Sequence, residues 1–272
     1  MTTVRIIGAG RAGRSFAGAF AAVGVGIRGF LGQSDGISSA AVGVDVLLLT
    51  VPDRVVASVA SAVRPVPSTV VVHCSGALGL EVLAPHERVG ALHPLVALPD
   101  PVVGAERLLA GGYFSIAGDR AVTDLVVALG GRMLEIPPEL RAGYHAAACV
   151  ASNHLVALLG QVQRVAASVG LPLEVFLPLA QGALDDVVRL GPAAALTGPA
   201  ARGDVVTIEQ HRRALDPAER GGYDAGVALA RRLVTAEPAR AGALARSHAG
   251  EEGQRRVATG ELVESAGTGS WR

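Results

Sequence analysis

Residues 4–13 read V-R-I-I-G-A-G-R-A-G, a short apolar run that stops on the pattern G-x-G-x-x-G, formed by Gly8, Gly10 and Gly13. A stretch rich in small residues, 12–24, follows at once. In this pattern the first glycine permits a tight turn, the second lets the backbone approach a pyrophosphate, and the third allows close packing of helix on strand. The helix N-terminus then offers free N–H groups to the phosphates. The stretch predicts a dinucleotide site; the alternative is a turn without a ligand, because glycine is frequent here (35 of 272 residues).

Short apolar runs alternate with helix-favouring stretches through the first half of the chain. Their near-continuous apolar character fits strands buried on both faces, as parallel strands require. The segment 32–43 is too short for a full crossover helix and a loop, so one helix is expected to be shortened there. The seven predicted strands span residues 4–7, 27–31, 45–51, 69–73, 89–92, 113–117 and 132–136.

The sequence pattern changes after Pro137-Pro138. Strand-like runs no longer occur there, and alanine-rich stretches favour helix. Predicted helical stretches span residues 140–170, 173–190, 205–215 and 221–236. The expected fold class is therefore α/β, a Rossmann-type, doubly wound and mostly parallel sheet followed by an all-helical second domain. The expected domains are a dinucleotide-binding domain (1–138), a helical second domain (139–250), to which the resemblance described below assigns substrate binding and dimerisation, and a flexible tail (251–272).

Bulk composition narrows the class of protein. Half of the 272 residues are hydrophobic and 18% are charged, which favours a well-packed globular protein. The formal net charge is zero and the basic residues are scattered, so we expect neither nucleic acid nor a membrane surface as a partner. No apolar run approaches the roughly 18 residues of a membrane span, and the first run is too short for a signal peptide. We therefore expect a cytoplasmic protein.

Cysteine and lysine usage excludes several kinds of chemistry. Cys74 and Cys149 are too few for a disulfide framework and wrongly spaced for a zinc site, so we expect no metal and interpret both as small buried side chains. The chain contains no lysine; all 24 of its basic residues are arginine. A lysine general base, a Schiff-base mechanism and a P-loop are therefore excluded.

In open α/β sheets, ligands bind outside the carboxyl ends of the strands. Pro52 follows one such end, and since proline cannot continue a central ladder, the backbone there is expected to face a nicotinamide ribose. Ser75 and Gly76 take the same place one strand later. The predicted cofactor-binding residues are Gly8, Gly10, Arg11, Ala12, Gly13, Gln33, Ser34, Thr50, Val51, Pro52, Ser75 and Gly76.

The end of the second predicted strand bears on the choice between NAD and NADP. An acidic residue there bonds a ribose 2′-hydroxyl, whereas a cation receives a 2′-phosphate. Gln33 and Ser34 offer donors to a phosphate, with Arg11 or Arg14 within reach, but Asp35 would repel it if its side chain pointed inward. Asp35 also suits a turn or a helix cap. The sequence favours NADP, with NAD as the open alternative.

Two features place polar groups near the ligand site that is predicted at the carboxyl ends of the strands. His93 ends a predicted strand, and its alternative role is a hydrogen bond to its own turn. On a continuous helix, at about 100° per residue, His145, Cys149 and Ser152 share a face and Asn153 lies about 80° from His145. Burying such polar side chains against an apolar helical bundle costs desolvation free energy, so we interpret them as candidates for catalysis. The alternative is that they are buried and that hydrogen-bond partners satisfy their polar atoms.

A third feature is the stretch A-L-T-G-P-A-A-R-G-D at residues 195–204. We interpret it as a rigid polar loop between helices, the kind of segment in which binding groups concentrate. Arg202 suits bidentate binding of a substrate carboxylate. The alternative is an interhelical turn in which Arg202 pairs with Asp204 or with a helix end.

With these pieces in place, the chain resembles a family of NAD(P)-dependent oxidoreductases that join a Rossmann-like domain to a helical C-terminal domain of formerly unknown function. Those proteins are distant relatives of pyrroline-5-carboxylate reductase, 3-hydroxyisobutyrate dehydrogenase and ketopantoate reductase. The resemblance implies a long helix opening the second domain, a substrate pocket between domains and a homodimer formed through the helical half. The matching pieces are residues 8–13, 91–95, 144–148, Ser152-Asn153 and 195–204.

The chain also departs from these relatives. Several of them place a catalytic lysine one helical turn before an asparagine; here Asn153 is present, but Cys149 stands in the lysine position. Thr197 begins a sequence similar to the substrate loop of the pyrroline-carboxylate reductases, without its threonine pair. Gln33 stands where the resemblance implies an arginine.

These inferences predict an oxidoreductase that passes hydride from NADPH to a small carboxylate-bearing carbonyl, a 2-oxo acid such as ketopantoate being favoured by resemblance. His145 or His93 is expected to protonate the product, Asn153 to orient the substrate and Arg202 to bind its carboxylate. Thr197 and Ser152 complete the expected substrate pocket. The alternatives are a cyclic imine reductase and, in a different class, a non-catalytic dinucleotide-binding sensor.

Overall fold

The computed structural model describes residues 1–32 and 34–235. These residues form two compact units, the first spanning Met1–Ala157 and the second beginning at Leu158. The sheet ends shortly before Pro138, whereas the first unit continues through the helix that follows. The expected tail at 251–272 and the predicted cofactor residue Gln33 lie outside the described residues.

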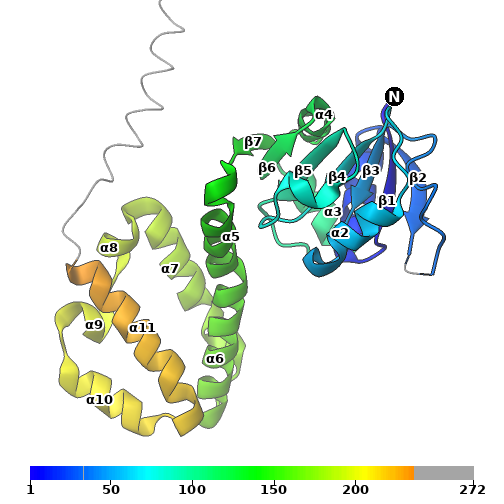
Figure 1. The fold of residues 1–272 in the computed structure, drawn as a ribbon. Helices are drawn as coiled ribbons and strands as arrows, with labels where there is room; N and C mark the ends of the chain where they lie inside the picture. The colour runs from blue at the N-terminus through cyan, green and yellow to red at the C-terminus, as the bar shows by residue number, and fades with distance from the viewer. Residues whose placement is uncertain (33, 236–272) are drawn as a thin grey trace, which may run out of the picture. The chain divides into compact units, whose positions relative to one another are not determined.

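A seven-stranded sheet forms the centre of the first unit (Figure 1). All seven predicted strands are confirmed: β1 (Thr3–Ile7), β2 (Gly26–Leu31), β3 (Val46–Leu49), β4 (Val70–His73), β5 (Val89–Pro94), β6 (Tyr113–Gly118) and β7 (Arg132–Glu135). Their order is β2-β1-β3-β4-β5-β6-β7. Strands β1 to β5 run parallel, β6 is antiparallel to β5, and β7 is parallel to β6. The prediction of a mostly parallel sheet is therefore confirmed.

Helices cover both faces of this sheet, which explains the apolar strands. Alternate residues of β3 point to opposite faces, so Leu48 packs in one cluster with Phe16 and Phe20, while Leu47 packs in another with Val56. The helices of this unit are α1 (Arg11–Ala22), α2 (Asp53–Ala62), α3 (Pro101–Leu109), α4 (Arg120–Ala128) and α5 (Arg141–Cys149), with short 3₁₀ turns at Leu80–Leu83 and Pro138–Leu140. Between β2 and β3 the described residues form turns only, so the helix expected to be shortened there is replaced by turns.

The strand order creates a switch point beside the glycine turn. The chain goes from β1 to β2 on one side and then to β3 on the other side of β1. Ligands of open α/β sheets bind at the carboxyl ends of the strands where the order reverses. Because β4 and β5 run parallel to β3, their carboxyl ends lie at the same sheet edge.

The helix that follows the sheet is not continuous, contrary to the interpretation of residues 140–170. A π-helical turn (Val150–His154) separates α5 from α6 (Leu155–Ser168). In such a turn each backbone N–H bonds to the carbonyl five residues earlier, instead of four. The side chains after Cys149 therefore no longer follow the regular spacing of about 100° per residue. Turns of this kind occur frequently at functional sites.

The second unit is helical throughout its described residues, as predicted. After a short 3₁₀ turn (Leu173–Val175), it contains α7 (Leu177–Leu190), α8 (Pro192–Ala195), α9 (Gly198–Arg202), α10 (Val205–Ala214) and α11 (Pro217–Thr235). The interpretation of residues 195–204 as a loop is wrong, because α9 lies within it. Pro199 stands in the first turn of α9, where proline is tolerated, and Gly203 ends the helix in the left-handed conformation (φ 69°).

Among the described residues, no individual helix has both the length and the apolar character that a membrane span requires. One bent pair of helical segments, Pro138–Ser168 with Leu173–Leu190, meets that requirement jointly, on length and composition alone.

Candidate functional site

The glycine turn after β1 has the geometry that its sequence predicts. Gly8 takes a positive φ of 109°, and its N–H donates to the carbonyl of Leu31 at 2.9 Å. A Cβ on Gly13 would overlap the carbonyl oxygen of Gly8 and lie 2.6 Å from Oγ1 of Thr50. Gly13 therefore permits the close packing of α1 on the sheet.

Gly10 differs from the other two glycines, because a Cβ there would meet nothing within 4 Å. Gly10 is also the N-cap of α1 and has no side chain with which to cover the first-turn N–H groups, and the first turn carries no acidic residue. This open, electropositive helix end fits a pyrophosphate. The residues present therefore fit a dinucleotide.

The arginines and the threonine around this turn have distinct contacts. Arg14 Nε donates to the carbonyl of Ala9 at 2.9 Å, and its guanidinium lies over the ring of Phe30. Arg11 is exposed and lines the large cavity described below. Thr50 Oγ1 donates to the carbonyl of Gly8 at 2.7 Å and thereby ties the end of β3 to the glycine turn.

The end of β2 shows which way Asp35 points. Its carboxylate accepts from the N–H of Gly32 at 2.6 Å, so Asp35 closes its own turn, as one of the two interpretations of the sequence expected. Ser34 lies beside it and is exposed.

Two histidines and a tyrosine meet at the carboxyl end of β5. Nδ1 of His93 lies 2.9 Å from the hydroxyl of Tyr144 on α5. The rings of His93 and His145 lie edge to face, with centroids 5.6 Å apart. The alternative in which His93 bonds its own turn is therefore wrong, because its partner lies 51 residues away.

Gly76 lies directly against this cluster. A Cβ at Gly76 would overlap Nδ1 of His145 and lie 2.8 Å from Nε2 of His93. The sequence placed Gly76 at the cofactor edge, but this steric requirement depends on α5 and is not visible in the local pattern.

Ser75, just before Gly76, has a structural role for its side chain. Its hydroxyl donates to the carboxylate of Asp53 at 2.7 Å and accepts from the N–H groups of Ala77 and Leu78, each at 3.1 Å. These bonds fix the turn after β4, and the N–H of Ser75 also donates to Nδ1 of His73 at 3.2 Å.

The sequence analysis missed Arg141, the first residue of α5. Its side chain is 4% exposed, and one guanidinium nitrogen donates to the carbonyl of Ser75 at 3.3 Å. Its Nε is buried without a hydrogen-bond partner, and among the described residues no carboxylate forms an ion pair with it. The available signal was its position three and four residues before Tyr144 and His145, on the same helix face.

Burial and this arginine set the protonation of the cluster. Burial first, and then the positive charges of His145 and Arg141, lower the pKa of His93 to about 4. His93 is therefore neutral at neutral pH. Burial raises the pKa of Tyr144, whereas the hydroxyl of Ser115 and then the charge of Arg141 oppose that rise. His73, on β4, also has its pKa lowered, chiefly by burial.

A cavity of about 880 Å³ opens beside the cluster. One wall is the apolar chain after β5, residues 94–99, and the other is α5 with the π-helical turn. His145, Cys149, Ser152 and Asn153 line it together with His93 and Tyr144. The polar residues singled out in the first unit thus share one cavity. Sγ of Cys149 lies 3.7 Å from Nε2 of His145, and both cysteines are free and only partly buried.

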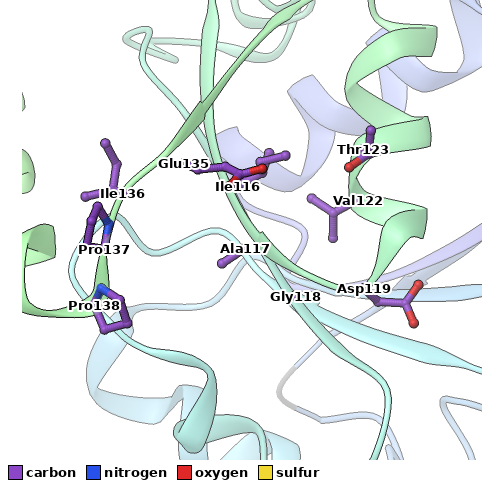
Figure 2. A pocket seen from close by; sticks show the side chains of 10 residues that line it. All are labelled: Ile116, Ala117, Gly118, Asp119, Val122, Thr123, Glu135, Ile136, Pro137 and Pro138. Atoms are coloured by element: carbon purple, nitrogen blue, oxygen red, sulfur yellow. The ribbon is translucent and has the colours of Figure 1, made fainter.

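A smaller cavity of about 510 Å³ lies elsewhere in the first unit (Figure 2). Figure 2 shows Pro137 and Pro138 on one side of it and Thr123 of α4 on the other. Because β6 and β7 run opposite to β5, their carboxyl ends point away from the edge that carries the glycine turn. Asp119, which also lines this cavity, is bound by Arg88 at 2.9 Å. We therefore do not place the functional site here.

Thr197 and Arg202, the other predicted substrate residues, belong to the second unit, and both are exposed. The carboxylate of Asp204 accepts from the N–H and the hydroxyl of Thr207 at 3.0 and 2.7 Å and caps α10. The alternative in which Arg202 forms an ion pair with Asp204 is not seen in the described part of the chain.

Comparison with protein families gives one match, to the domain of unknown function DUF2520, over residues 114–230. These residues include β6, β7 and most of the helices that follow them, so the match agrees with the resemblance to proteins with a helical domain of formerly unknown function. No curated protein matches the chain.

Solved structures confirm the fold over most of the chain. A protein from Bacteroides fragilis, provisionally described as an NADP oxidoreductase, is 20% identical with a TM-score of 0.70, over 85% of this chain and 98% of that one. A Thermotoga maritima protein is 24% identical with a TM-score of 0.62, over 85% and 98%. Pyrroline carboxylate reductase from Plasmodium falciparum, solved with NADP bound, is 15% identical with a TM-score of 0.55, over 86% and 98%. The α/β sheet with a helical second half is therefore the fold of this chain.

Proposed function

We propose that the chain is an NADPH-dependent reductase of a small carbonyl or imine compound. The observation that carries this proposal is the position of two features on one sheet edge. The open glycine turn at Gly10 lies at the switch point, and His93 and Tyr144 lie at the carboxyl end of β5, beside a cavity. A structural neighbour from Plasmodium falciparum has NADP bound, which supports the choice of cofactor.

The turn at residues 8–13 would hold the pyrophosphate, with Thr50, Val51 and Pro52 at the neighbouring strand end. Bound NADPH supplies a hydride to the substrate carbon. The carboxylate of Asp35 accepts a hydrogen bond from the N–H of Gly32 in its own turn. Arg11, exposed at the start of α1, is the cation that we assign to the phosphates.

The proton of the reduction comes from the cluster of His93, Tyr144 and His145. Ser152 and Asn153 line the same cavity and orient the carbonyl or imine by hydrogen bonds. His93 is neutral at neutral pH because burial lowers its pKa, so it does not carry a spare proton itself.

Two substrate classes remain candidates. The first is a 2-oxo acid such as ketopantoate, with Arg202 as the residue that binds the carboxylate. The second is an imine, which the apolar wall at residues 94–99 favours because it suits an uncharged substrate body. A neighbour from Aspergillus terreus, a reductive aminase solved with cyclohexanone and allyl amine, supports the second class; it is 16% identical with a TM-score of 0.62, over 85% of this chain and 95% of that one.

We also assign a second copy of this chain as partner, bound through the helical half. On α7, Leu177, Leu184 and Val188 stand at i, i+7 and i+11 and share one face, and all three are exposed, Val188 by 89%. A row of exposed apolar side chains on one helix face is typical of an interface.

The experiment is a titration of the purified chain with NADPH and NADH, followed by absorbance assays with pyruvate, ketopantoate, cyclohexanone and 1-pyrroline-5-carboxylate. We expect NADPH to bind more tightly than NADH and to be oxidised with at least one compound. Reduction of the three carboxylates, pyruvate, ketopantoate and 1-pyrroline-5-carboxylate, in preference to cyclohexanone supports the role of Arg202, whereas preference for cyclohexanone contradicts it. If neither nucleotide binds, the proposed function is wrong. Binding of NADPH without oxidation by any compound favours the non-catalytic sensor.

A further inference from the structure

Tyr144 is the hydroxyl group at the centre of the cluster, yet neither the sequence analysis nor the cofactor site assigns it a role. Its side chain is partly buried, lines the cavity of about 880 Å³ and comes from the first turn of α5. Its hydroxyl lies 2.9 Å from Nδ1 of His93, and the two rings meet edge to face with centroids 5.6 Å apart. The phenol is therefore fixed in position by a partner and faces the space that a substrate would enter.

His93 is positioned to hydrogen-bond to this phenol, but not to act as the proton donor itself. Gly76 lies against its Nε2, and the ring of His145 covers it edge to face. We assign to His93 the tautomer with its proton on Nδ1, in which the neutral imidazole donates that N–H to the phenol oxygen and the phenol hydrogen remains available to a substrate in the cavity.

Arg141 supplies the charge that this arrangement needs. Burying a charged guanidinium without a carboxylate partner costs free energy of folding. This cost indicates that the charge of Arg141 has a role in the cluster. Its charge opposes the rise in the pKa of Tyr144 that burial causes, and it adds to burial and to His145 in lowering the pKa of His93. Its bond to the carbonyl of Ser75 fixes it beside the cluster.

We propose that Tyr144 donates the proton that completes the reduced product, with His93 and Arg141 as its positioning residues. This inference rests on the proposed function. The electron pair arrives as the hydride of the nucleotide and forms the new C–H bond. The O–H bond of Tyr144 breaks, and its proton forms the O–H bond of an alcohol or the N–H bond of an amine. Solvent returns one proton to the phenolate, while the Nδ1–H of neutral His93 stays hydrogen-bonded to its oxygen, so each turnover consumes one proton.

The second unit contains a matched control. Nδ1 of His211 lies 2.9 Å from the hydroxyl of Tyr223, and these rings also meet edge to face, with centroids 6.0 Å apart. Tyr223→Phe therefore removes the same kind of hydrogen bond as Tyr144→Phe, from a pair within the second unit.

The first measurement is steady-state kinetics of Tyr144→Phe and Tyr223→Phe with NADPH and the compound that the unmodified chain reduces fastest. We expect Tyr144→Phe to lower kcat by about 10²–10⁴, the usual contribution of a general acid, with KM and NADPH affinity within a few-fold of the unmodified chain. Tyr223→Phe should leave kcat unchanged. Unchanged turnover in Tyr144→Phe would overturn the inference and leave the proposed function intact.

The second measurement does not depend on turnover. Tyrosine labelled with ¹³C at Cζ is observed by NMR in the complex with NADP⁺, while pyruvate and then cyclohexanone are added. We expect the resonance of Tyr144, assigned by its loss in Tyr144→Phe, to shift as a carbonyl compound binds, and that of Tyr223 to stay in place. A Tyr144 resonance that neither probe moves contradicts the inference. Failure of NADP⁺ and NADPH to bind at all would instead contradict the proposed function.

Discussion

At the scale of single residues, the protonation of His93 couples the site to the stability of the fold. The pKa of this histidine is lowered to about 4 in the folded chain, against 6.5 for an ordinary histidine, chiefly because the ring is buried. Between these two values the unfolded chain binds more protons than the folded chain. The free energy of unfolding therefore falls as the pH drops from 6.5 towards 4, and this contribution is fully lost below about pH 4.

The loss of stability towards low pH gives a testable prediction for His93→Gln, which keeps a polar side chain but cannot titrate. We expect the variant to lose less stability than the unmodified chain when the pH is lowered from about 7 to about 5. The measurement is urea unfolding at both values. Part of the dependence should persist, because the pKa of His73 is also lowered by burial. A variant with the same pH dependence as the unmodified chain would show that His93 is not the titrating group.

Most of the polar residues in the cavity could be predicted from the sequence, because they lie close together on one helix or at the end of one strand. His145, Ser152 and Asn153 belong to one such stretch. Arg141 was missed because its partner, the carbonyl of Ser75, lies 66 residues away and carries no sequence signal. Gly76 was expected at the site for its position, but its contact with two histidines depends on the placement of α5.

At the scale of elements, the unit of β1, the glycine turn and α1 gives a matched pair of variants. In Gly13→Ala the new methyl group would overlap the carbonyl of Gly8, so the chain should lose about 1–3 kcal/mol of stability or fail to fold. In Gly10→Ala it would enter open space, and the backbone φ of −74° suits alanine. Stability should therefore stay unchanged, while the methyl group occupies the space expected for the pyrophosphate.

We expect Gly10→Ala to weaken NADPH binding by about tenfold or more, equivalent to about 1.4 kcal/mol. Thermal unfolding checks the stability of both variants, and nucleotide titration checks the affinity of Gly10→Ala. An unchanged affinity in a stable Gly10→Ala protein would place the pyrophosphate elsewhere.

Strands were easier to predict than the helical details. The seven strands are buried on both faces, so each appears as an unbroken apolar run. The π-helical turn at Val150–His154 was missed because its residues, V-A-S-N-H, are compatible with an ordinary helix. Helix α9 was missed because its Gly198-Pro199 start resembles a turn, although proline is accepted in a first helical turn.

At the scale of the whole molecule, the proposed homodimer can be tested on α7. The double variant Leu184→Asp and Val188→Asp places two charges on the exposed apolar face of this helix, and we expect it to be monomeric. Leu179→Asp is the control, because Leu179 is 73% exposed on the opposite face of α7 and should leave the dimer intact. Light scattering after gel filtration measures the mass of each. A dimeric double variant would exclude this face as the interface.

The fold class could be predicted from the sequence, whereas the direction of each strand could not. The reversal at β6 is invisible in the sequence, because buried parallel and antiparallel strands carry the same apolar pattern. The reversal matters for function, since it turns the ends of β6 and β7 away from the edge that carries the glycine turn.

The two walls of the large cavity differ in a way that bears on how such an enzyme diversifies. Most of the polar groups come from α5 and the π-helical turn, and the apolar wall comes from residues 94–99, the last residue of β5 and the irregular segment that follows it. Loops accept substitutions more readily than packed elements. Exchange of side chains on that segment is thus expected to change which substrate is preferred without altering the proposed proton donor.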